Sequence, residues 1–341
     1  MNVRKSIFAA VTTLTLAAVP AVAQAIDPAP GAALLATMTP ASVPHPFKDI
    51  PVAHADAAPP TKSAYVMTAF TNASQSVMNV YDSADGAHFF QRKAPAYSPP
   101  KGDLMRDPSV MKHTDGWYYV TYTTGWSGQT IGLARSRDLQ GWSFVRNIDV
   151  PVPGVTQVWA PEWFIDSDGT VNIILTIGKS GPQGTFEPYR ITATDAGLGK
   201  WTTPKPLGLG QNYIDSFVVK IGATYHNFIK NETTKFIEHA TAISLDGPWA
   251  MVGVGDWAGW GRFFEGPALT RLPDGGWRIY FDAYMVRQYW YSDSHDGFKT
   301  WSPKTEMVGS GTLRHFTVLN QRVGPTPSVV AVSKKGEGPS H

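Results

Sequence analysis

The chain has 341 residues, with Lys+Arg 29 against Asp+Glu 27 and a formal net charge of +2. Charged residues make up only 16%, where about 25% is usual, and a hydrophobic fraction of 43% is too high for a disordered chain. The absence of cysteine excludes a disulfide scaffold, a zinc–thiolate site and a thiol nucleophile. Without a Lys/Arg-dense stretch, the chain also lacks the basic footprint of a nucleic-acid-binding protein.

Residues 1–25 are predicted to form a secretory signal peptide. Arg4 and Lys5 precede an apolar stretch over residues 7–22, and Ala23-Gln24-Ala25 offers a cleavage site. The apolar stretch contains Pro20 and is shorter than the ~20 residues of a membrane span, so a retained anchor is the weaker alternative. We therefore expect a secreted protein, periplasmic or extracellular, without membrane attachment after cleavage.

Two further segments lack any structural period. Residues 26–62 are rich in Ala and Pro and are predicted to be a linker, and residues 333–341 are predicted to be a flexible tail. Residues 63–332 between them are expected to form the folded domain, which we expect to be a monomer.

This domain repeats itself four times. The repeats begin near positions 107, 161, 215 and 265, with spacings of 54, 54 and 50 residues. Each contains about four strand-sized runs punctuated by Gly, Asp or Pro, without a long 3.6-residue period. A period near 50 made of four antiparallel strands is typical of a β-propeller blade.

The remaining residues predict a fifth blade. Residues 64–90 and 313–332 supply further strands, and together they would close the ring from both ends of the chain. We therefore predict an all-β, five-bladed β-propeller in which each blade is a four-stranded antiparallel sheet. A two-sheet sandwich is the alternative. Trp142, Trp201, Trp249 and Trp301 recur at repeat ends and are predicted to pack in the blade cores.

An acidic residue stands near the start of each repeat: Asp107, Glu162, Asp215 and Glu265. In a propeller the first strand of each blade lines the central channel, so these acids are expected at equivalent places around one funnel. Two carboxylates on either side of a bond are the usual apparatus of glycoside hydrolysis, and crowding separates their pKa values. The alternative is that each acid caps a turn.

Taken in order, five motifs resemble those of glycoside hydrolase family 43, the group of arabinanases, arabinofuranosidases and β-xylosidases. The motifs are Arg106-Asp107-Pro108-Ser109, Trp159-Ala160-Pro161-Glu162, Ile214-Asp215-Ser216, Phe264-Glu265-Gly266-Pro267 and Leu313-Arg314-His315-Phe316-Thr317. The resemblance implies that Asp107 is the general base, Asp215 the residue that tunes pKa, and Glu265 the general acid. It also implies inversion, with base and acid roughly 6.5–9.5 Å apart.

The family implies a histidine at the channel centre that helps to hold calcium or a water cluster. His315 is the candidate for such an indirect metal site, and a core histidine is the alternative. No cofactor is expected to be required, with a structural calcium in the central channel as the one addition. Glu162 stands where many members have Asp, and Phe316 where relatives often have Gly, so Phe316 is expected to narrow the funnel.

Several other residues are candidates for substrate binding. Trp126, in a Gly-rich loop, is expected to stack on the sugar, although it could instead pack against the next blade. Trp159, Glu162 and Phe316 are also expected at the substrate pocket, with Trp159 as part of its wall. Arg287 is expected near the sugar hydroxyls, or paired with Asp282 or Asp293. Another three histidines, His113, His239 and His295, lack partners at metal-ligand spacing and are expected at the surface.

The sequence therefore predicts a secreted, inverting glycoside hydrolase with a carbohydrate substrate. The motifs are most similar to those of exo-acting furanosidases, which implies release of terminal arabinofuranose or galactofuranose. The alternatives are a β-xylosidase, galactanase or endo-arabinanase of the same family, or a non-catalytic carbohydrate-binding propeller.

Overall fold

The computed structural model describes residues 64–180, 185–307 and 312–322. The predicted signal peptide, linker and tail lie outside the described residues and stay predictions. All described residues belong to the unit Pro51–His341. Their one helix is the short 3₁₀ turn η1 (Pro100–Gly102), and no helix in these ranges is long and apolar enough to cross a membrane.

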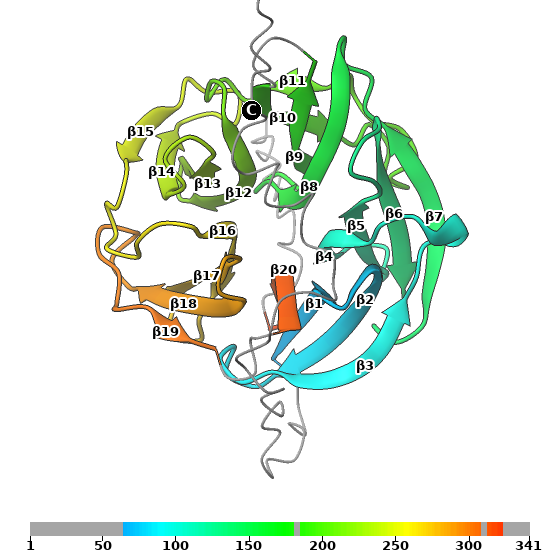
Figure 1. The fold of residues 1–341 in the computed structure, drawn as a ribbon, viewed down its shortest axis with the longest axis horizontal. Helices are drawn as coiled ribbons and strands as arrows, with labels where there is room; N and C mark the ends of the chain where they lie inside the picture. Colours follow the sequence, from blue (N-terminus) through cyan, green and yellow to red (C-terminus); the bar gives the residue numbers. More distant parts are fainter. Residues whose placement is uncertain (1–63, 181–184, 308–311, 323–341) are drawn as a thin grey trace, which may run out of the picture. The chain divides into compact units, whose positions relative to one another are not determined.

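The described strands form five four-stranded antiparallel sheets around a central axis (Figure 1), so the predicted five-bladed propeller is confirmed. Four blades each use consecutive strands, which follow chain order from the axis outward. Blade 1 contains β4 (Arg106–Lys112), β5 (Tyr118–Thr123), β6 (Thr130–Ser136) and β7 (Trp142–Asp149). Blade 2 contains β8 (Val155–Ile165), β9 (Val171–Lys179), β10 (Thr185–Thr192) and β11 (Lys205–Pro206). Blade 3 contains β12 (Tyr213–Ile221), β13 (Thr224–Asn231), β14 (Ile237–Ala242) and β15 (Ala250–Gly253). Blade 4 contains β16 (Glu265–Arg271), β17 (Trp277–Ala283), β18 (Gln288–Ser294) and β19 (Thr305–Glu306).

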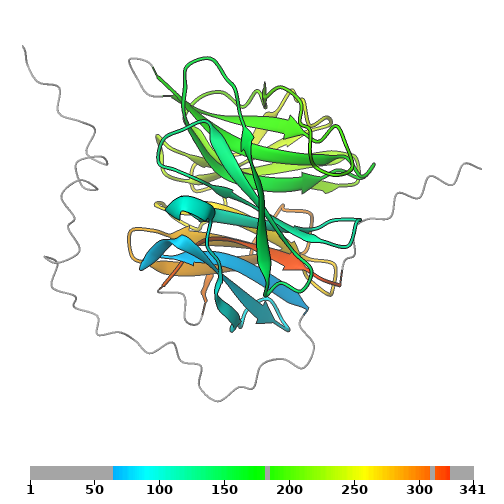
Figure 2. The same cartoon turned by 90° about the vertical axis from the view of Figure 1, so that its right-hand side faces the viewer.

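The fifth blade joins the two ends of the described chain. Its strands, from the axis outward, are β20 (Leu313–Asn320), β1 (Tyr65–Thr71), β2 (Ser74–Ser83) and β3 (Phe90–Tyr97). In Figure 2 the orange-red β20 lies beside the blue strands of the amino-terminal side. Because β20 supplies the inner strand, the ring closes by main-chain hydrogen bonds between distant parts of the chain, as predicted.

Aromatic and aliphatic side chains fill the spaces between blades. The four tryptophans at the repeat ends are partly buried, and each packs against a different apolar cluster: Trp142, Trp201, Trp249 and Trp301. Of the three histidines expected at the surface, only His295 is exposed. His113 and His239 are buried because each packs against aromatic rings of its own blade, a contact that their spacing in the sequence does not reveal.

Each inner strand carries a β-bulge near its start. In all five blades, two paired residues of the inner strand are three positions apart, whereas their partners on the second strand are only two positions apart. The inner strand therefore contains one extra residue at this point, which defines a β-bulge. The first residue of every bulge has a positive φ: Asp107, Ala160, Asp215, Gly266 and His315. These five positions form a ring at one end of the channel, which we call the funnel; the inner strands end at the opposite, far mouth.

Candidate active site

The funnel brings together carboxylates from three blades. Asp107 from β4 and Asp215 from β12 occupy bulge positions, and Glu265 of β16 directly precedes the bulge at Gly266. His315 from β20 links the cluster, with its Nδ1 atom 3.3 Å from Asp107 Oδ1 and 4.0 Å from Asp215 Oδ2. The structure thus places the three predicted acids around one histidine, although they are far apart in the sequence.

The prediction that the four acids occupy equivalent positions on their inner strands is wrong. Only Asp107 and Asp215 share the bulge position; Glu265 lies one residue before it and Glu162 two residues after it. Glu162 is buried and accepts hydrogen bonds from Ser109 Oγ (2.5 Å) and Thr317 Oγ1 (3.0 Å). It therefore lies one layer below the bulge ring.

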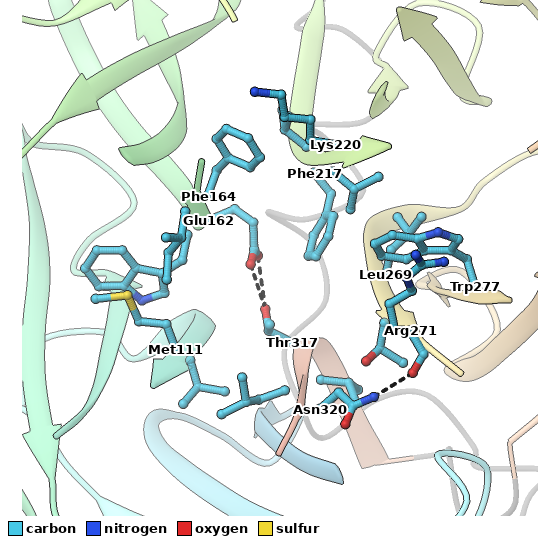
Figure 3. Close-up of a pocket in the computed structure, with 18 of the residues that line it drawn as sticks. Met111, Glu162, Phe164, Phe217, Lys220, Leu269, Arg271, Trp277, Thr317 and Asn320 are labelled. Atoms are coloured by element: carbon cyan, nitrogen blue, oxygen red, sulfur yellow. Dashed lines mark hydrogen bonds between the residues drawn. The ribbon is translucent and has the colours of Figure 1, made fainter. Parts of the chain in front are cut away.

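Figure 3 shows Glu162 and Thr317 at a cavity of about 500 Å³. The other lining residues come mainly from the later halves of the inner strands, which makes this cavity the far mouth of the channel. The prediction that Glu162 binds substrate in the funnel is therefore wrong. Burial raises the pKa of Glu162 to about 7, although the hydroxyls of Ser109 and Thr317 act in the opposite direction.

Hydrogen bonds fix the orientation of Asp107 and Asp215. Thr123 Oγ1 donates to Asp107 Oδ2 over 2.7 Å and accepts a hydrogen bond from the Ala160 amide. The Gly266 amide donates to Asp215 Oδ2 over 3.1 Å. Thr123 belongs to the same blade as Asp107, but the Ala160 amide that orients Thr123 and the Gly266 amide that orients Asp215 come from neighbouring blades. Contacts between blades therefore contribute to where both carboxylates point.

Glu265 is held by two cations whose roles the sequence does not reveal. Arg314 Nη2 lies 2.8 Å from Glu265 Oε1, and Lys230 Nζ lies 2.8 Å from Glu265 Oε2. Arg314 belongs to one of the five motifs, but nothing in that motif indicates which acid it pairs with. The sequence gives little signal for Lys230. The five residues before it, Tyr225–Ile229, include His226 and Asn227, and only the structure shows that all of them are buried.

These two cations lower the pKa of Glu265 relative to that of its neighbour Asp215. Burial by itself would raise the pKa of Glu265, but the charges of Lys230 and Arg314 lower it to about 2. Burial raises the pKa of Asp215 to about 6, with His315 opposing this shift and Glu265 adding to it. Asp215 therefore holds a proton more readily than Glu265 does in the unliganded protein.

His315 lies among the carboxylates of the cluster, and they act on its pKa. Burial acts to lower its pKa, but Asp107, Asp215 and Glu265 together raise it above the ordinary value. Among the described residues, no group of three or more His, Asp or Glu side chains is arranged to hold a metal ion directly. The calcium or water site expected at His315 stays a prediction.

Aromatic side chains border the funnel beside Asp107. Trp126, which is 50% exposed, lies in the loop after β5, and its ring meets that of Trp159 edge-on at 6.1 Å between centroids. Trp159 packs in turn against Phe186, and the Arg106 guanidinium lies 4.4 Å from the Trp126 ring centroid. The exposed face of Trp126 is thus held in place by its neighbours.

The other two residues predicted to bind substrate, Arg287 and Phe316, lie in different surroundings. Arg287 is exposed at the turn between β17 and β18, and it forms no ion pair with the described residues, since Asp282 pairs with Arg314 and Asp293 with Arg278. Phe316 is fully buried and stacks on Tyr289 at 3.9 Å. The prediction that Phe316 narrows the funnel is wrong because the bulge at His315 turns the next side chain into the core between blades.

A five-bladed propeller with clustered acids at one end of its channel is an arrangement suited to glycoside hydrolysis, which uses paired carboxylates. The model of glycosyl hydrolases family 43 matches residues 99–281, which is more than half of the chain. The chain belongs to this family.

Comparison with individual proteins agrees with this assignment. Alpha-L-arabinofuranosidase 43 of Humicola insolens is 28% identical over 162 residues, which cover 43% of this chain. The match spans only 32% of that relative's length.

Solved structures show a similar fold. A thermostable family-43 glycoside hydrolase superposes with a TM-score of 0.55 at 16% identity, covering 73% of this chain and 94% of its own. An endo-1,4-beta-xylanase from Bacteroides thetaiotaomicron gives a TM-score of 0.53 at 14% identity, covering 71% and 91%. A family-43 beta-1,3-galactosidase with galactodeoxynojirimycin gives 0.55 at 14% identity, covering 70% and 90%. At these identities the likeness concerns the fold alone.

Proposed function

We propose that the protein is an inverting, exo-acting furanosidase that releases terminal arabinofuranosyl or galactofuranosyl residues. The observation that supports this most is the convergence of Asp107, Asp215 and Glu265 around His315. The partial match to an arabinofuranosidase favours arabinofuranose. The sequence of residues 1–25 supports secretion to the periplasm or the exterior, and we propose that the secreted enzyme is a monomer.

In the proposed mechanism Asp107 is the base. It removes a proton from water while the water oxygen attacks the anomeric carbon from the face opposite the leaving group. Glu265 donates a proton to the glycosidic oxygen as the bond to the leaving group breaks, so the product sugar has the inverted configuration. Thr123 and His315 hold Asp107 in the orientation that this step needs.

Asp215 supplies the proton that Glu265 lacks in the free enzyme. Its raised pKa makes it the store of that proton, and its hydrogen bond from Gly266 places it beside the residue that must receive it. Glu265 remains the proposed donor because its side chain is 15% exposed against 8% for Asp215, which puts it nearer to the entering substrate.

The test is a panel of aryl glycosides of α-L-arabinofuranose, β-D-galactofuranose, β-D-xylose and β-D-galactose. We expect turnover of a furanoside and a first product whose anomeric configuration, followed by ¹H NMR, is opposite to that of the substrate. Turnover of a pyranoside alone would contradict the proposed sugar. A retained configuration would contradict the mechanism, and glycan binding without hydrolysis of any member would favour a carbohydrate-binding propeller.

A further inference from the structure

Lys230 is a buried lysine with two possible acidic partners. It lies on β13 opposite Ile214 of β12, and its side chain is 3% exposed. Its Nζ atom is 2.8 Å from Glu265 Oε2 and 3.3 Å from Glu232 Oε2, and it lies 4.6 Å from the ring centroid of Tyr284. A buried ammonium group needs such partners because it has lost its hydration.

In the free enzyme both oxygens of Glu265 are engaged by cations, Arg314 on Oε1 and Lys230 on Oε2. A carboxylate held in this way stays ionised and has no proton to give. For Glu265 to act as an acid, one of the two cations must withdraw from it.

Arg314 is the partner less able to move. Its Nε atom is 2.6 Å from Asp282 Oδ2, and its Nη1 donates to Asn72 Oδ1 over 3.1 Å. Its charge is also fixed, because a guanidinium does not lose its proton in proteins. Lys230, by contrast, ends in a single rotatable ammonium group that already lies close to Glu232.

We propose that Lys230 is a positioning residue that transfers its ion pair from Glu265 to Glu232 when the substrate enters, and so converts Glu265 into the acid. The inference rests on the proposed function, in which Glu265 is the proton donor. Charge is conserved in the step: Asp215 loses a proton and becomes a carboxylate, Glu265 gains it and becomes neutral, and Glu232 balances Lys230. After the glycosidic oxygen takes the proton, Glu265 is ionised again and Lys230 returns.

The surroundings of Lys230 are consistent with this exchange. The acidic groups that face it are Glu265 from β16, Glu232 from the turn after β13, and Asp215 from β12, with the phenol of Tyr284 on the fourth side. Glu232 is also paired with Lys235 over 2.5 Å, which holds its carboxylate in place. The side chain of Glu232 is 24% exposed, so it lies nearer to solvent than Glu265, which is 15% exposed.

The experiment compares two substrates of the sugar that the panel identifies, the phenyl glycoside and the 2,4-dinitrophenyl glycoside, whose leaving group needs no acid. Glu232→Asp keeps the charge but shortens its reach toward Lys230. We expect kcat on the phenyl glycoside to fall by about ten- to hundredfold, within the range that general acid catalysis supplies. On the dinitrophenyl glycoside we expect a change below about twofold.

Two further variants keep the outcome decisive. Glu187→Asp makes the same change in a glutamate of blade 2 that pairs with Lys179 over 3.2 Å, and it serves as the matched control, with the phenyl to dinitrophenyl ratio of the wild type. If Glu232→Asp does not fold, Glu232→Gln takes its place. We expect Glu232→Gln to move the basic limb of the kcat profile to lower pH, because Lys230 then stays on Glu265.

The outcomes separate the two proposals. The proposed movement of Lys230 would be overturned if Glu232→Asp and Glu232→Gln kept the wild-type ratio of kcat on the two glycosides. It would also be overturned if kcat fell by the same factor on both. Glu265→Gln, measured alongside, tests the proposed function itself. If its kcat falls by the same factor on both glycosides, Glu265 is not the acid, whatever Lys230 does.

Discussion

Gly266 and His315 meet at the centre of the funnel, and the geometry there depends on a missing side chain. A Cβ atom on Gly266 would lie 2.8 Å from His315 Cγ, and the backbone of Gly266 has a φ of +56°. Glycine therefore serves two purposes at this position. It allows the bulge conformation, and it leaves the space that the imidazole ring needs to reach Asp107 and Asp215.

Replacing Gly266 with alanine should therefore damage catalysis as well as stability. We expect Gly266→Ala to cost about 1–2 kcal/mol for the left-handed backbone and to lower kcat by at least about tenfold, since His315 must shift. Gly275→Ala is the control, because Gly275 has a φ of +88° but open space around its Cβ position. Thermal unfolding and kcat measure the two effects. Equal kcat in both variants would show that the position of His315 does not matter.

Phe316 and Trp126 give opposite expectations. Phe316→Ala removes a fully buried ring and should lower the free energy of unfolding by about 3–5 kcal/mol with an unchanged KM.

Trp126→Ala removes a half-exposed ring beside Asp107 and should raise KM by about three- to tenfold with little loss of stability. Denaturant unfolding and steady-state kinetics measure both. A raised KM in Phe316→Ala alone would return Phe316 to the funnel.

At the scale of a single blade, the interior of blade 3 contains two buried histidines whose rings stack, His226 and His239. His226 Nδ1 and His239 Nε2 are 3.0 Å apart, and the His239 ring stacks on Phe228 at 4.5 Å. Burial, together with the neighbouring His226, lowers the pKa of His239 to about 3. The pair thus prefers to stay uncharged in the folded state.

This preference predicts acid-sensitive stability. Below the ordinary histidine pKa of 6.5, His239 is protonated in the unfolded chain but stays neutral in the folded chain until about pH 3. The free energy of unfolding therefore falls as the pH drops from about 6.5 toward about 3. The loss should be about 1.4 kcal/mol for each pH unit. His239→Phe keeps a ring at this position and should flatten the dependence. Unfolding free energies between pH 7 and 4 measure it, and parallel curves for the two proteins would disprove the role of His239.

The turn between the third and fourth strand carries a short repeat. The segments Ser83–Asp85, Ser136–Asp138 and Ser294–Asp296 share the spacing Ser-x-Asp, and in each the serine hydroxyl donates a hydrogen bond to the aspartate at the same turn of its blade. A glycine follows the aspartate directly in the first and third segments but not in the second. The spacing can be read from the sequence, whereas the hydrogen bond is seen only in the structure.

At the scale of the whole molecule, closure by β20 connects the fold to the site. A chain ending at Thr312 lacks the inner strand of the fifth blade and with it Arg314 and His315. We expect this truncation to lose cooperative unfolding and all activity. A chain ending at Arg322 keeps all twenty strands of the described residues and should match the full chain in both respects. Circular dichroism melting and activity measure this, and cooperative melting of the shorter protein would contradict the role of β20 in closure.

The architecture could be predicted from the sequence because a period near 50 with Gly and Asp turns requires little tertiary information. The same pattern indicated Asp107, Asp215 and Glu265 as neighbours, which the structure confirms. It did not reveal the register, because one bulge residue per inner strand moves Glu162 into a deeper layer and Phe316 into the core. Lys230 was missed because its significance comes from β13 lying beside β16, a contact between blades.

The central claim is that Asp107 and Glu265 act as base and acid on opposite sides of one glycosidic bond. The most direct measurement is kcat/KM of Asp107→Ala and Glu265→Ala on the phenyl and 2,4-dinitrophenyl glycosides of the preferred sugar. We predict that Glu265→Ala loses about 10²–10⁴-fold on the phenyl glycoside but stays within about tenfold of the wild type on the dinitrophenyl glycoside. We predict that Asp107→Ala loses activity on both, because water must be activated in either case. The reverse pattern, or leaving-group dependence in Asp215→Ala but not in Glu265→Ala, would contradict the assignment.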